Sequence, residues 1–324
     1  MIKMFPYKIC SLVNRGNWIT NDKVKVLIET NNYFSEDIWM SVLNKVINTS
    51  ELEIKFFNNK YVGYKFIKDA NVMFSFGDNF YYDKSNLQMQ YYGLSQPDRF
   101  DNSITEVHYA KGVSCISVAE YCLTYSLILL NESVKYFKNQ YRKKWHQEII
   151  PFESSKLNNK IVGVVGLGNN GKKIAEIFKK NGCTIYGHDI IDEKYISVDF
   201  FCKKFDDLLE SCDIVIVAVN LTSETKDLFN KDSFAKMKRS AFLINISRGS
   251  VINEDDLYYA LKNKIIAGAA LDVTVNEPLS RYSKLWKLHN LVITPHISGN
   301  INKFYLNVME DFSSKLKLYL DKYV

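Results

Sequence analysis

A run of closely spaced glycines constrains the fold of this chain more than any other feature. Residues 160–175 read KIVGVVGLGNNGKKIA, so Gly166, Gly168 and Gly171 lie directly between an apolar strand and an amphipathic helix. The first glycine permits the tight turn, and the third lets the helix pack closely on the strand. The second lets the backbone approach a pyrophosphate at the helix N-terminus, where free amide groups favour an anion. This segment therefore predicts a parallel α/β sheet with a dinucleotide-binding turn.

Two neighbouring features indicate which dinucleotide is bound. The backbone amides of Asn169 and Asn170 would donate hydrogen bonds to the pyrophosphate. Eighteen residues beyond Gly171, the next strand ends at Asp189, whose carboxylate can accept hydrogen bonds from both ribose hydroxyls of adenosine. The same carboxylate would repel a 2′-phosphate, and the nearest cation in the sequence is Lys194. We therefore expect NAD, not NADP, as the cofactor.

Short apolar runs alternate with segments of helical period through the second half of the chain. The runs expected to form strands cover residues 161–165, 184–186, 214–218, 241–245, 267–271 and 291–294. Six strands in this alternation predict one doubly wound parallel sheet. This half of the chain is therefore expected to be a Rossmann domain.

The N-terminal region shows a weaker pattern of the same kind, with expected strands at residues 24–29, 72–76 and 87–92. Ser35 is placed to cap a helix after the first strand. That helix would bury one stripe of aliphatic side chains, namely Ile38, Val42, Val46 and Ile47. A last helix over residues 302–323 has its own apolar stripe, formed by Phe304, Val308, Phe312 and Leu316, and we expect it to pack back on this first domain.

Together these patterns predict an α/β protein with two Rossmann-like domains. The NAD-binding domain, with the doubly wound parallel sheet, would cover residues 123–299. It would be inserted into a smaller, flavodoxin-like substrate domain formed by residues 1–122 and 300–324. A chain of 324 residues, of which 47% are hydrophobic, is long enough to build two such cores.

Composition limits the partners and the compartment. The net charge is only +6, from 42 basic and 36 acidic residues, and the lysines are scattered, so we expect no nucleic-acid partner. The most apolar stretch, residues 118–130, is too short to span a bilayer, so we expect no membrane partner. The six cysteines lack CxxC spacing, which predicts neither a metal site nor a disulfide framework. Residues 1–22 lack the pattern of a signal peptide, so the expected location is the cytoplasm.

Three polar segments each follow an apolar strand, and they contribute Arg248, Glu277 and His296. Because the carboxyl ends of parallel strands meet at one edge of the sheet, these residues are expected to converge beside the cofactor. Hydride transfer to a keto acid requires a cation for the carboxylate, an acid for the carbonyl oxygen, and a group that keeps that acid charged. The three residues supply these parts, which predicts an NAD-dependent oxidoreductase acting on a small 2-keto or 2-hydroxy acid.

These segments resemble the D-2-hydroxyacid dehydrogenase family, which includes phosphoglycerate, glyoxylate/hydroxypyruvate and D-lactate dehydrogenases. The similarity also covers residues 117–120 (SVAE), residues 157–171 and residues 222–225 (TSET). The resemblance implies that Arg248 holds the substrate carboxylate and keto oxygen. It also implies that His296 donates the proton in reduction and accepts it in oxidation, with Glu277 as its partner. D-specificity follows from this resemblance alone.

The same resemblance assigns further binding residues. Asp272 would hold the nicotinamide carboxamide. The residues that would line this end of the cofactor site are Ile246, Ser247, Ser298 and Gly299. The backbone amides of Leu94, Ser95 and Gln96 would cover the substrate.

The chain departs from the family in two loops. The family's substrate loop usually reads GxGxD, whereas this chain has Ser95 at the second glycine and an additional Pro97. Proline stiffens a loop and removes an amide donor, so the identity of the keto acid stays open. Asn220 also stands where the family usually has a proline, after the fourth strand of the cofactor domain.

Each candidate catalytic residue also has a purely structural interpretation. Arg248 could pair with Asp255, Glu277 could be a turn residue before a proline, and His296 could be an ordinary loop histidine. One alternative function is an NAD-sensing binding protein without turnover, similar to corepressors that resemble this family. Another is oxidation of formate or phosphite. Finally, Trp145 and its surrounding loop resemble the arm through which family members dimerise, so a homodimer is expected.

Overall fold

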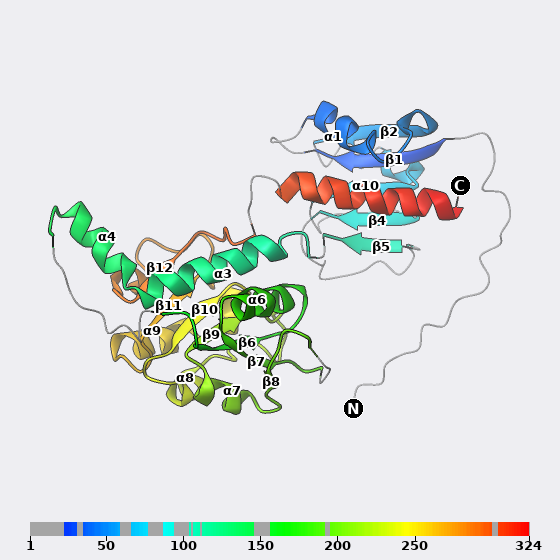
Figure 1. The fold of residues 1–324 in the computed structure, drawn as a ribbon. Helices are drawn as coiled ribbons and strands as arrows, with labels where there is room; N and C mark the ends of the chain where they lie inside the picture. The colour runs from blue at the N-terminus through cyan, green and yellow to red at the C-terminus, as the bar shows by residue number, and fades with distance from the viewer. Residues whose placement is uncertain are drawn as a thin grey trace. The chain divides into compact units, whose positions relative to one another are not determined.

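Two parallel sheets organise the protein, and each belongs to its own structural unit (Figure 1). The computed structural model describes residues 23–30, 35–58, 66–76, 87–93, 104, 106–110, 112–145, 156–191, 195–299 and 304–323. The first unit combines Met1–Lys111 with Tyr305–Val324, and the second is Gly112–Phe304. The two sheets with their helices confirm the predicted α/β fold class.

The first unit contains a five-stranded sheet in which every neighbouring pair is parallel. Its strands are β1 (Val24–Glu29), β2 (Leu52–Phe57), β3 (Val72–Ser75), β4 (Met89–Tyr92) and β5 (Glu106–Tyr109). The order β2-β1-β3-β4-β5 is that of a flavodoxin-like sheet. β2 and β5 were not predicted. They are the two edge strands, and because an edge is partly exposed, their charged residues break up the apolar pattern.

Helix α1 (Glu36–Leu43) begins after Ser35 as predicted, although the Ser35 side chain makes no capping hydrogen bond, and the stripe that it buries shares only Val42 with the predicted one. Trp39, Val42 and Leu43 are buried, whereas Ile38 and Val46 are only partly buried. The Trp39 ring packs edge-on against Phe74 of β3, with 4.7 Å between ring centroids. The rest of the predicted stripe was wrong because it left out Trp39, whose ring is buried in the aromatic core of the first unit.

The C-terminal helix α10 (Phe304–Tyr323) packs in the first unit, as predicted. Val308, Phe312 and Leu316 are fully buried. The Phe312 ring contacts the rings of Trp39, Phe74 and Tyr91 at centroid distances of 5.9, 5.2 and 5.5 Å. A residue near the C-terminus therefore completes a core whose other members come from the N-terminal third of the chain.

The second unit contains a seven-stranded parallel sheet. Its strands are β6 (Ile161–Val165), β7 (Thr184–His188), β8 (Phe200–Phe201), β9 (Ile214–Val217), β10 (Phe242–Asn245), β11 (Gly268–Leu271) and β12 (Leu291–Ile293). The six predicted strands are present, and the short edge strand β8 was missed. In the order β12-β11-β10-β9-β6-β7-β8, the chain adds β7 and β8 on one side of β6 and then adds β9 to β12 on the other side. Doubly wound sheets bind ligands at the point where the strand order reverses in this way, here between β6 and β9.

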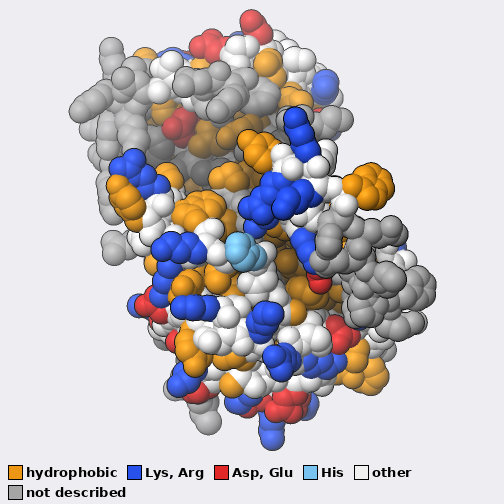
Figure 2. Space-filling model, turned by 90° about the vertical axis from the view of Figure 1, so that its left-hand side faces the viewer, with side chains coloured by type: hydrophobic (Ala, Val, Ile, Leu, Met, Phe, Trp, Pro, Cys, Tyr) orange, Lys and Arg blue, Asp and Glu red, His pale blue; other side chains and the backbone are white. Residues whose placement is uncertain are grey.

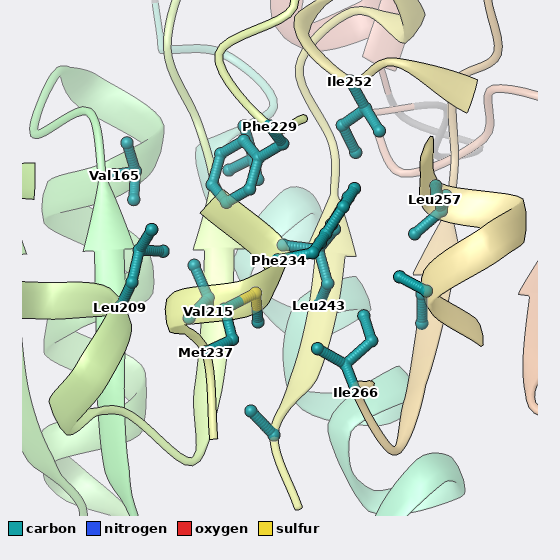
Figure 3. Packing of buried hydrophobic residues seen from close by; sticks show 14 of the residues in the cluster. Val165, Leu209, Val215, Phe229, Phe234, Met237, Leu243, Ile252, Leu257 and Ile266 are labelled. Carbon is teal, nitrogen blue, oxygen red and sulfur yellow. The ribbon is translucent and has the colours of Figure 1, made fainter. Parts of the chain in front are cut away.

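Helices cover both faces of this sheet (Figure 1). Val215 and Val217 of β9 belong to one buried cluster and Ile214 and Ile216 to the other, because successive strand residues point to opposite faces. The first cluster also takes in α7 (Phe205–Ser211), α8 (Lys231–Lys236) and α9 (Glu254–Lys262). Figure 3 shows its members, including Phe229, Phe234 and Leu257, gathered over the strand that carries Leu243.

The opposite face is covered by α3 (Cys115–Leu130) and α6 (Asn169–Lys180). Val118 and Cys122 of α3 share a buried cluster with Ile174 and Phe178 of α6. Helix α3 therefore lies wholly in the second unit, and a domain boundary at residue 122 would divide it. Among the described residues, the remaining helices are α4 (Ser133–Tyr141) and the short 3-10 helices η1 (Thr49–Glu51), η2 (Ile67–Asp69), η3 (Gly249–Val251) and η4 (Lys284–Lys287). Over the described ranges, no helix is both long and apolar enough to cross a membrane.

Truncation of the α10 anchor tests this account of the first unit. We expect Phe312→Ala to lower the free energy of unfolding by about 3–5 kcal/mol, because it leaves a cavity among three aromatic rings. Leu318→Ala in the same helix is the control, since Leu318 is 63% exposed. Chemical denaturation followed by circular dichroism measures both variants, and equal midpoints for the two would contradict this role of Phe312.

Candidate cofactor and active site

The glycine turn joins β6 to α6 in the second unit, as its sequence predicted. Gly166 follows β6 with a φ of 94°, a conformation that side chains other than glycine rarely adopt. Its amide donates to the His188 carbonyl at 2.8 Å, which ties the turn to β7. A Cβ on Gly171 would lie 1.9 Å from the Gly166 carbonyl oxygen. The first and third glycines are therefore both required for the helix to start so close to the strand.

The second glycine has a different environment. A Cβ on Gly168 would meet no atom within 4 Å, so its backbone faces open space. Gly168 is the N-cap of α6, and no acidic residue stands in the first turn of that helix. Asn169 is exposed and Asn170 is partly buried. The backbone of Gly168, Asn169 and Asn170 thus offers an accessible helix N-terminus, which fits the pyrophosphate of a dinucleotide.

Asp189 lies beside this turn, directly after β7. Its Oδ2 accepts a 2.6 Å hydrogen bond from the Leu167 amide, and its Oδ1 accepts a 3.1 Å bond from the Ile191 amide. Each carboxylate oxygen retains further acceptor capacity, which suits the two ribose hydroxyls. Lys194 lies outside the described residues.

The loop that carries Arg248 follows β10 and is held by a buried side chain that the sequence analysis missed. Asn245 is fully buried; its Oδ1 accepts from the Ser247 amide at 3.0 Å, and its Nδ2 donates to the Arg248 carbonyl at 3.1 Å. The Ser247 hydroxyl donates to the Val219 carbonyl at 2.7 Å. Arg248 itself is exposed, and its Nη1 donates to the Ser247 carbonyl at 2.8 Å. A polar residue at the end of an apolar strand was the available signal for Asn245.

Gly249 brings the Arg248 loop against the loop that carries Glu277. A Cβ at Gly249 would lie 2.0 Å from the carbonyl carbon of Thr274 and 2.2 Å from the Val275 nitrogen. Both contacts are with backbone, so a side chain could not be accommodated by a rotamer change. The absence of a side chain at this position therefore sets the spacing between the two loops.

Asp272 follows β11 and holds the loop after β12. It is 1% exposed, and it accepts three hydrogen bonds from that loop. Its Oδ1 accepts from the Thr294 hydroxyl at 2.7 Å and from the Ile297 amide at 2.8 Å, and its Oδ2 accepts from the Ser298 amide at 2.8 Å. In this structure the carboxylate thus supports the loop that contains His296.

The side chains of His296 and Glu277 are within hydrogen-bonding distance, with 2.8 Å between Nδ1 and Oε2. Glu277 is itself held, because its Oε1 accepts from the Thr274 amide at 3.1 Å. With Nδ1 directed at a carboxylate, Nε2 is the ring nitrogen left to exchange a proton with a ligand. The two side chains are 48% and 40% exposed, so a small molecule can reach them. The arrangement can act as a general acid and base.

The other predicted binding residues have distinct environments. Ile246, Ser247 and Ser298 are buried, with exposures of 8%, 6% and 5%. A Cβ on Gly299 would lie 3.4 Å from the Ser114 hydroxyl, so this residue packs against the start of α3. Leu94, Ser95 and Gln96 lie outside the described residues.

Comparison with known proteins identifies the relatives of this chain. Residues 123–298, more than half of the chain, match the family described as "D-isomer specific 2-hydroxyacid dehydrogenase, NAD binding domain". The chain belongs to this family. The match covers the glycine turn, Asp189, and the loops with Arg248, Glu277 and His296.

Among curated relatives, a D-3-phosphoglycerate dehydrogenase of Archaeoglobus fulgidus is 34% identical over 61% of this chain and 38% of its own length. A human glyoxylate reductase/hydroxypyruvate reductase is 42% identical over 44% of each chain. Each alignment spans less than half of the relative. A solved 2-hydroxyacid dehydrogenase of Lactobacillus delbrueckii ssp. bulgaricus, in an NAD-complexed form, superposes with a TM-score of 0.76 over 92% of this chain and 97% of that one, at 20% identity. This structural similarity confirms the fold.

Two glycine substitutions test whether Gly171, which is tightly packed, and Gly168, which faces open space, contribute differently to stability. We expect Gly171→Ala to lower the free energy of unfolding by roughly 1–3 kcal/mol, because its Cβ would collide with backbone. Gly168→Ala should cost less than about 1 kcal/mol, since it loses only some N-cap preference. Thermal denaturation of the two variants measures the difference. A Gly168→Ala variant as unstable as Gly171→Ala would contradict the open space at Gly168.

Proposed function

We propose that this protein is an NAD-dependent oxidoreductase that transfers a hydride between the nicotinamide and a small 2-keto or 2-hydroxy acid. The observation that carries the proposal is the 2.8 Å contact between His296 Nδ1 and Glu277 Oε2. It lies in the same unit as a glycine turn and a helix N-terminus that fit a dinucleotide. The relatives named as phosphoglycerate dehydrogenase and glyoxylate/hydroxypyruvate reductase support the same class of reaction.

His296 is the proposed acid and base. In reduction it gives a proton to the carbonyl oxygen of the keto acid, and in oxidation it takes the proton of the hydroxyl group. When bound, the cofactor supplies or accepts the hydride. Glu277 stabilises the charged imidazolium and keeps the ring oriented through Nδ1. The Thr274 amide holds the carboxylate of Glu277 in place for this task.

Arg248 is the proposed anchor for the substrate carboxylate and keto oxygen. A guanidinium can form two parallel hydrogen bonds to a planar carboxylate, which a lysine cannot. Asn245 and Gly249 support this role because they fix the backbone on both sides of Arg248. Leu94, Ser95 and Gln96 are the proposed substrate-covering residues, and Ser95 with Pro97 distinguishes this chain from the family's usual loop.

The proposed cofactor site begins at the glycine turn. Gly166, Gly168 and Gly171 would admit the pyrophosphate, with Asn169 and Asn170 as amide donors. Asp189, held at 2.6 Å by the Leu167 amide, supports a preference for NAD, because a fixed carboxylate repels a 2′-phosphate. The residues proposed for the nicotinamide end are Ile246, Ser247, Asp272, Ser298 and Gly299.

The direct test is oxidation of NADH, followed at 340 nm, with a panel of 2-keto acids. The panel holds pyruvate, glyoxylate, hydroxypyruvate, phosphohydroxypyruvate and bulkier branched and aromatic acids. We expect turnover with at least one of them and weaker turnover with NADPH. His296→Ala should lower kcat at least about a hundredfold, because it removes the proton donor.

His289→Ala is the matched control, because His289 precedes β12, at the opposite end of that strand from His296, and contacts Lys138 Nζ at 3.4 Å. A His296→Ala variant with near wild-type turnover would overturn the proposed mechanism. If the wild type binds NADH tightly but turns over none of the acids in the panel, the NAD-sensing alternative would be favoured. Production of NADH from formate would show that the reaction is formate oxidation instead. The comparisons do not favour the sensing alternative, since the named relatives are enzymes.

We also propose that the protein is a cytoplasmic homodimer. Exposed aromatic side chains on and after α4 support the dimer, with Phe137 59%, Tyr141 92% and Trp145 98% exposed. Figure 2 shows the side of the molecule that bears α4, where hydrophobic side chains stand exposed among lysines and arginines. Buried free thiols support a reducing compartment, and they are Cys115, Cys122, Cys183, Cys202 and Cys212.

Sedimentation velocity at micromolar concentration checks the dimer. We expect the wild type to sediment with the mass of two chains, and Trp145→Asp to shift the population toward one chain, because a charge would enter an apolar contact. A wild type that sediments as a single chain would refute the dimer.

A further inference from the structure

Two hydrogen bonds join helix α3 to the loop that carries His296, and both involve hydroxyl groups of the helix. Ser117 Oγ donates to the Ser298 carbonyl at 2.9 Å. Tyr121 Oη lies 2.6 Å from Thr294 Oγ1. The two residues stand four positions apart, so they lie on the same face of the helix. They therefore hold the loop on both sides of His296.

The directions of these hydrogen bonds follow from the number of protons available. Asp272 is an acceptor for three donors, and one of them is the single hydroxyl proton of Thr294. Thr294 has no second proton to give, so in the 2.6 Å contact Tyr121 Oη must be the donor. The bonds thus form one chain that runs from Tyr121 through Thr294 to the Asp272 carboxylate.

Tyr121 is suited to be a permanent donor. Its side chain is 8% exposed, and burial raises the pKa of its hydroxyl well above the ordinary value, with a further contribution in the same direction from the nearby Asp272 charge. Tyr125 packs on the Tyr121 ring at a centroid distance of 4.2 Å and limits its movement. The hydroxyl proton therefore stays available for Thr294 throughout the usual pH range.

The backbone of His296 requires such support. Its φ is 54°, in the left-handed region, although the residue is not glycine. Such a conformation persists only where the surroundings determine it. The His296 amide donates to the Asp272 carbonyl at 2.9 Å, and the amides of Ile297 and Ser298 donate to the Asp272 carboxylate. These hydrogen bonds set the conformation of the loop, and α3 forms hydrogen bonds to its two ends, at Thr294 and Ser298.

We propose that Tyr121 and Ser117 are positioning residues, which clamp the 294–298 loop against Asp272 so that His296 stays paired with Glu277. The catalytic part of this inference rests on the proposed dehydrogenase function, whereas the clamp itself is a property of the fold. It assigns a role to Ser117 and Tyr121, two residues that the candidate active site did not include.

The first experiment reads the clamp without any assay of turnover. Hydrogen exchange measured by mass spectrometry on the full chain compares wild type, Tyr121→Phe and Tyr125→Phe over residues 294–299. We expect Tyr121→Phe to speed exchange of the loop amides about fivefold, the factor that corresponds to one neutral hydrogen bond. Tyr125→Phe should leave exchange unchanged, because among the described residues no hydrogen bond joins its hydroxyl to this loop. Exchange in residues 161–171 serves as an internal reference.

The second experiment tests whether the hydroxyl acts through His296. With the keto acid that supports turnover, Tyr121→Phe should lower kcat roughly tenfold while the Kd for NADH stays within about twofold. In the His296→Gln background the same substitution should have no further effect on kcat, because it acts only by positioning the imidazole. A general loss of structure would instead lower kcat equally in both backgrounds.

The outcomes separate the two hypotheses. Unchanged loop exchange in Tyr121→Phe overturns the clamp, whatever the enzyme does. Equal loss of kcat in both backgrounds overturns the positioning role. A wild type without turnover on any keto acid overturns the proposed function, and the exchange experiment still decides the clamp. Should Tyr121→Phe fail to fold, Ser117→Ala removes the other contact and is expected to speed exchange at the Ser298 end of the loop.

Discussion

A buried carboxylate is the interaction on which the candidate active site depends most. Asp272 is almost completely removed from water, and such a group is stable only when its oxygens accept hydrogen bonds. Three donors from the 294–298 loop meet this need. The hydrogen bonds that stabilise the buried carboxylate also hold the loop in place. They therefore stabilise the left-handed backbone of His296 as well. The position of His296 beside Glu277 thus depends on the hydrogen bonds that a buried neighbour, Asp272, requires.

The parallel sheet brings the remaining groups to the same edge. Strands β6, β10, β11 and β12 run in one direction, so the loops at their carboxyl ends lie at one side of the sheet. The glycine turn, Arg248, Glu277 and His296 all follow these strands. Close approach between the loops then requires small residues, and Gly249 is the clearest case, because any side chain there would overlap the Thr274 backbone.

Much of this arrangement could be predicted from local patterns. The glycine turn, the six longer strands of the second sheet and three of the four stripe residues of α10 were predicted correctly, because each follows from the spacing of a few neighbouring residues. The edge strands β2, β5 and β8 were missed, since partly exposed strands carry charged residues or are very short. The buried face of α1 was wrong because Trp39 meets Phe312, a partner from the other end of the chain.

The sequence by itself determined the class of fold, the dinucleotide turn and the three residues proposed for catalysis, because each is encoded by residue type and short-range spacing. Only the tertiary structure decided how those residues are held. Thr294 and Tyr121 carry no motif, and their hydrogen bond joins two residues that lie 173 positions apart in the sequence. Such pairings depend on the packing of whole helices and strands, and local spacing therefore cannot specify them.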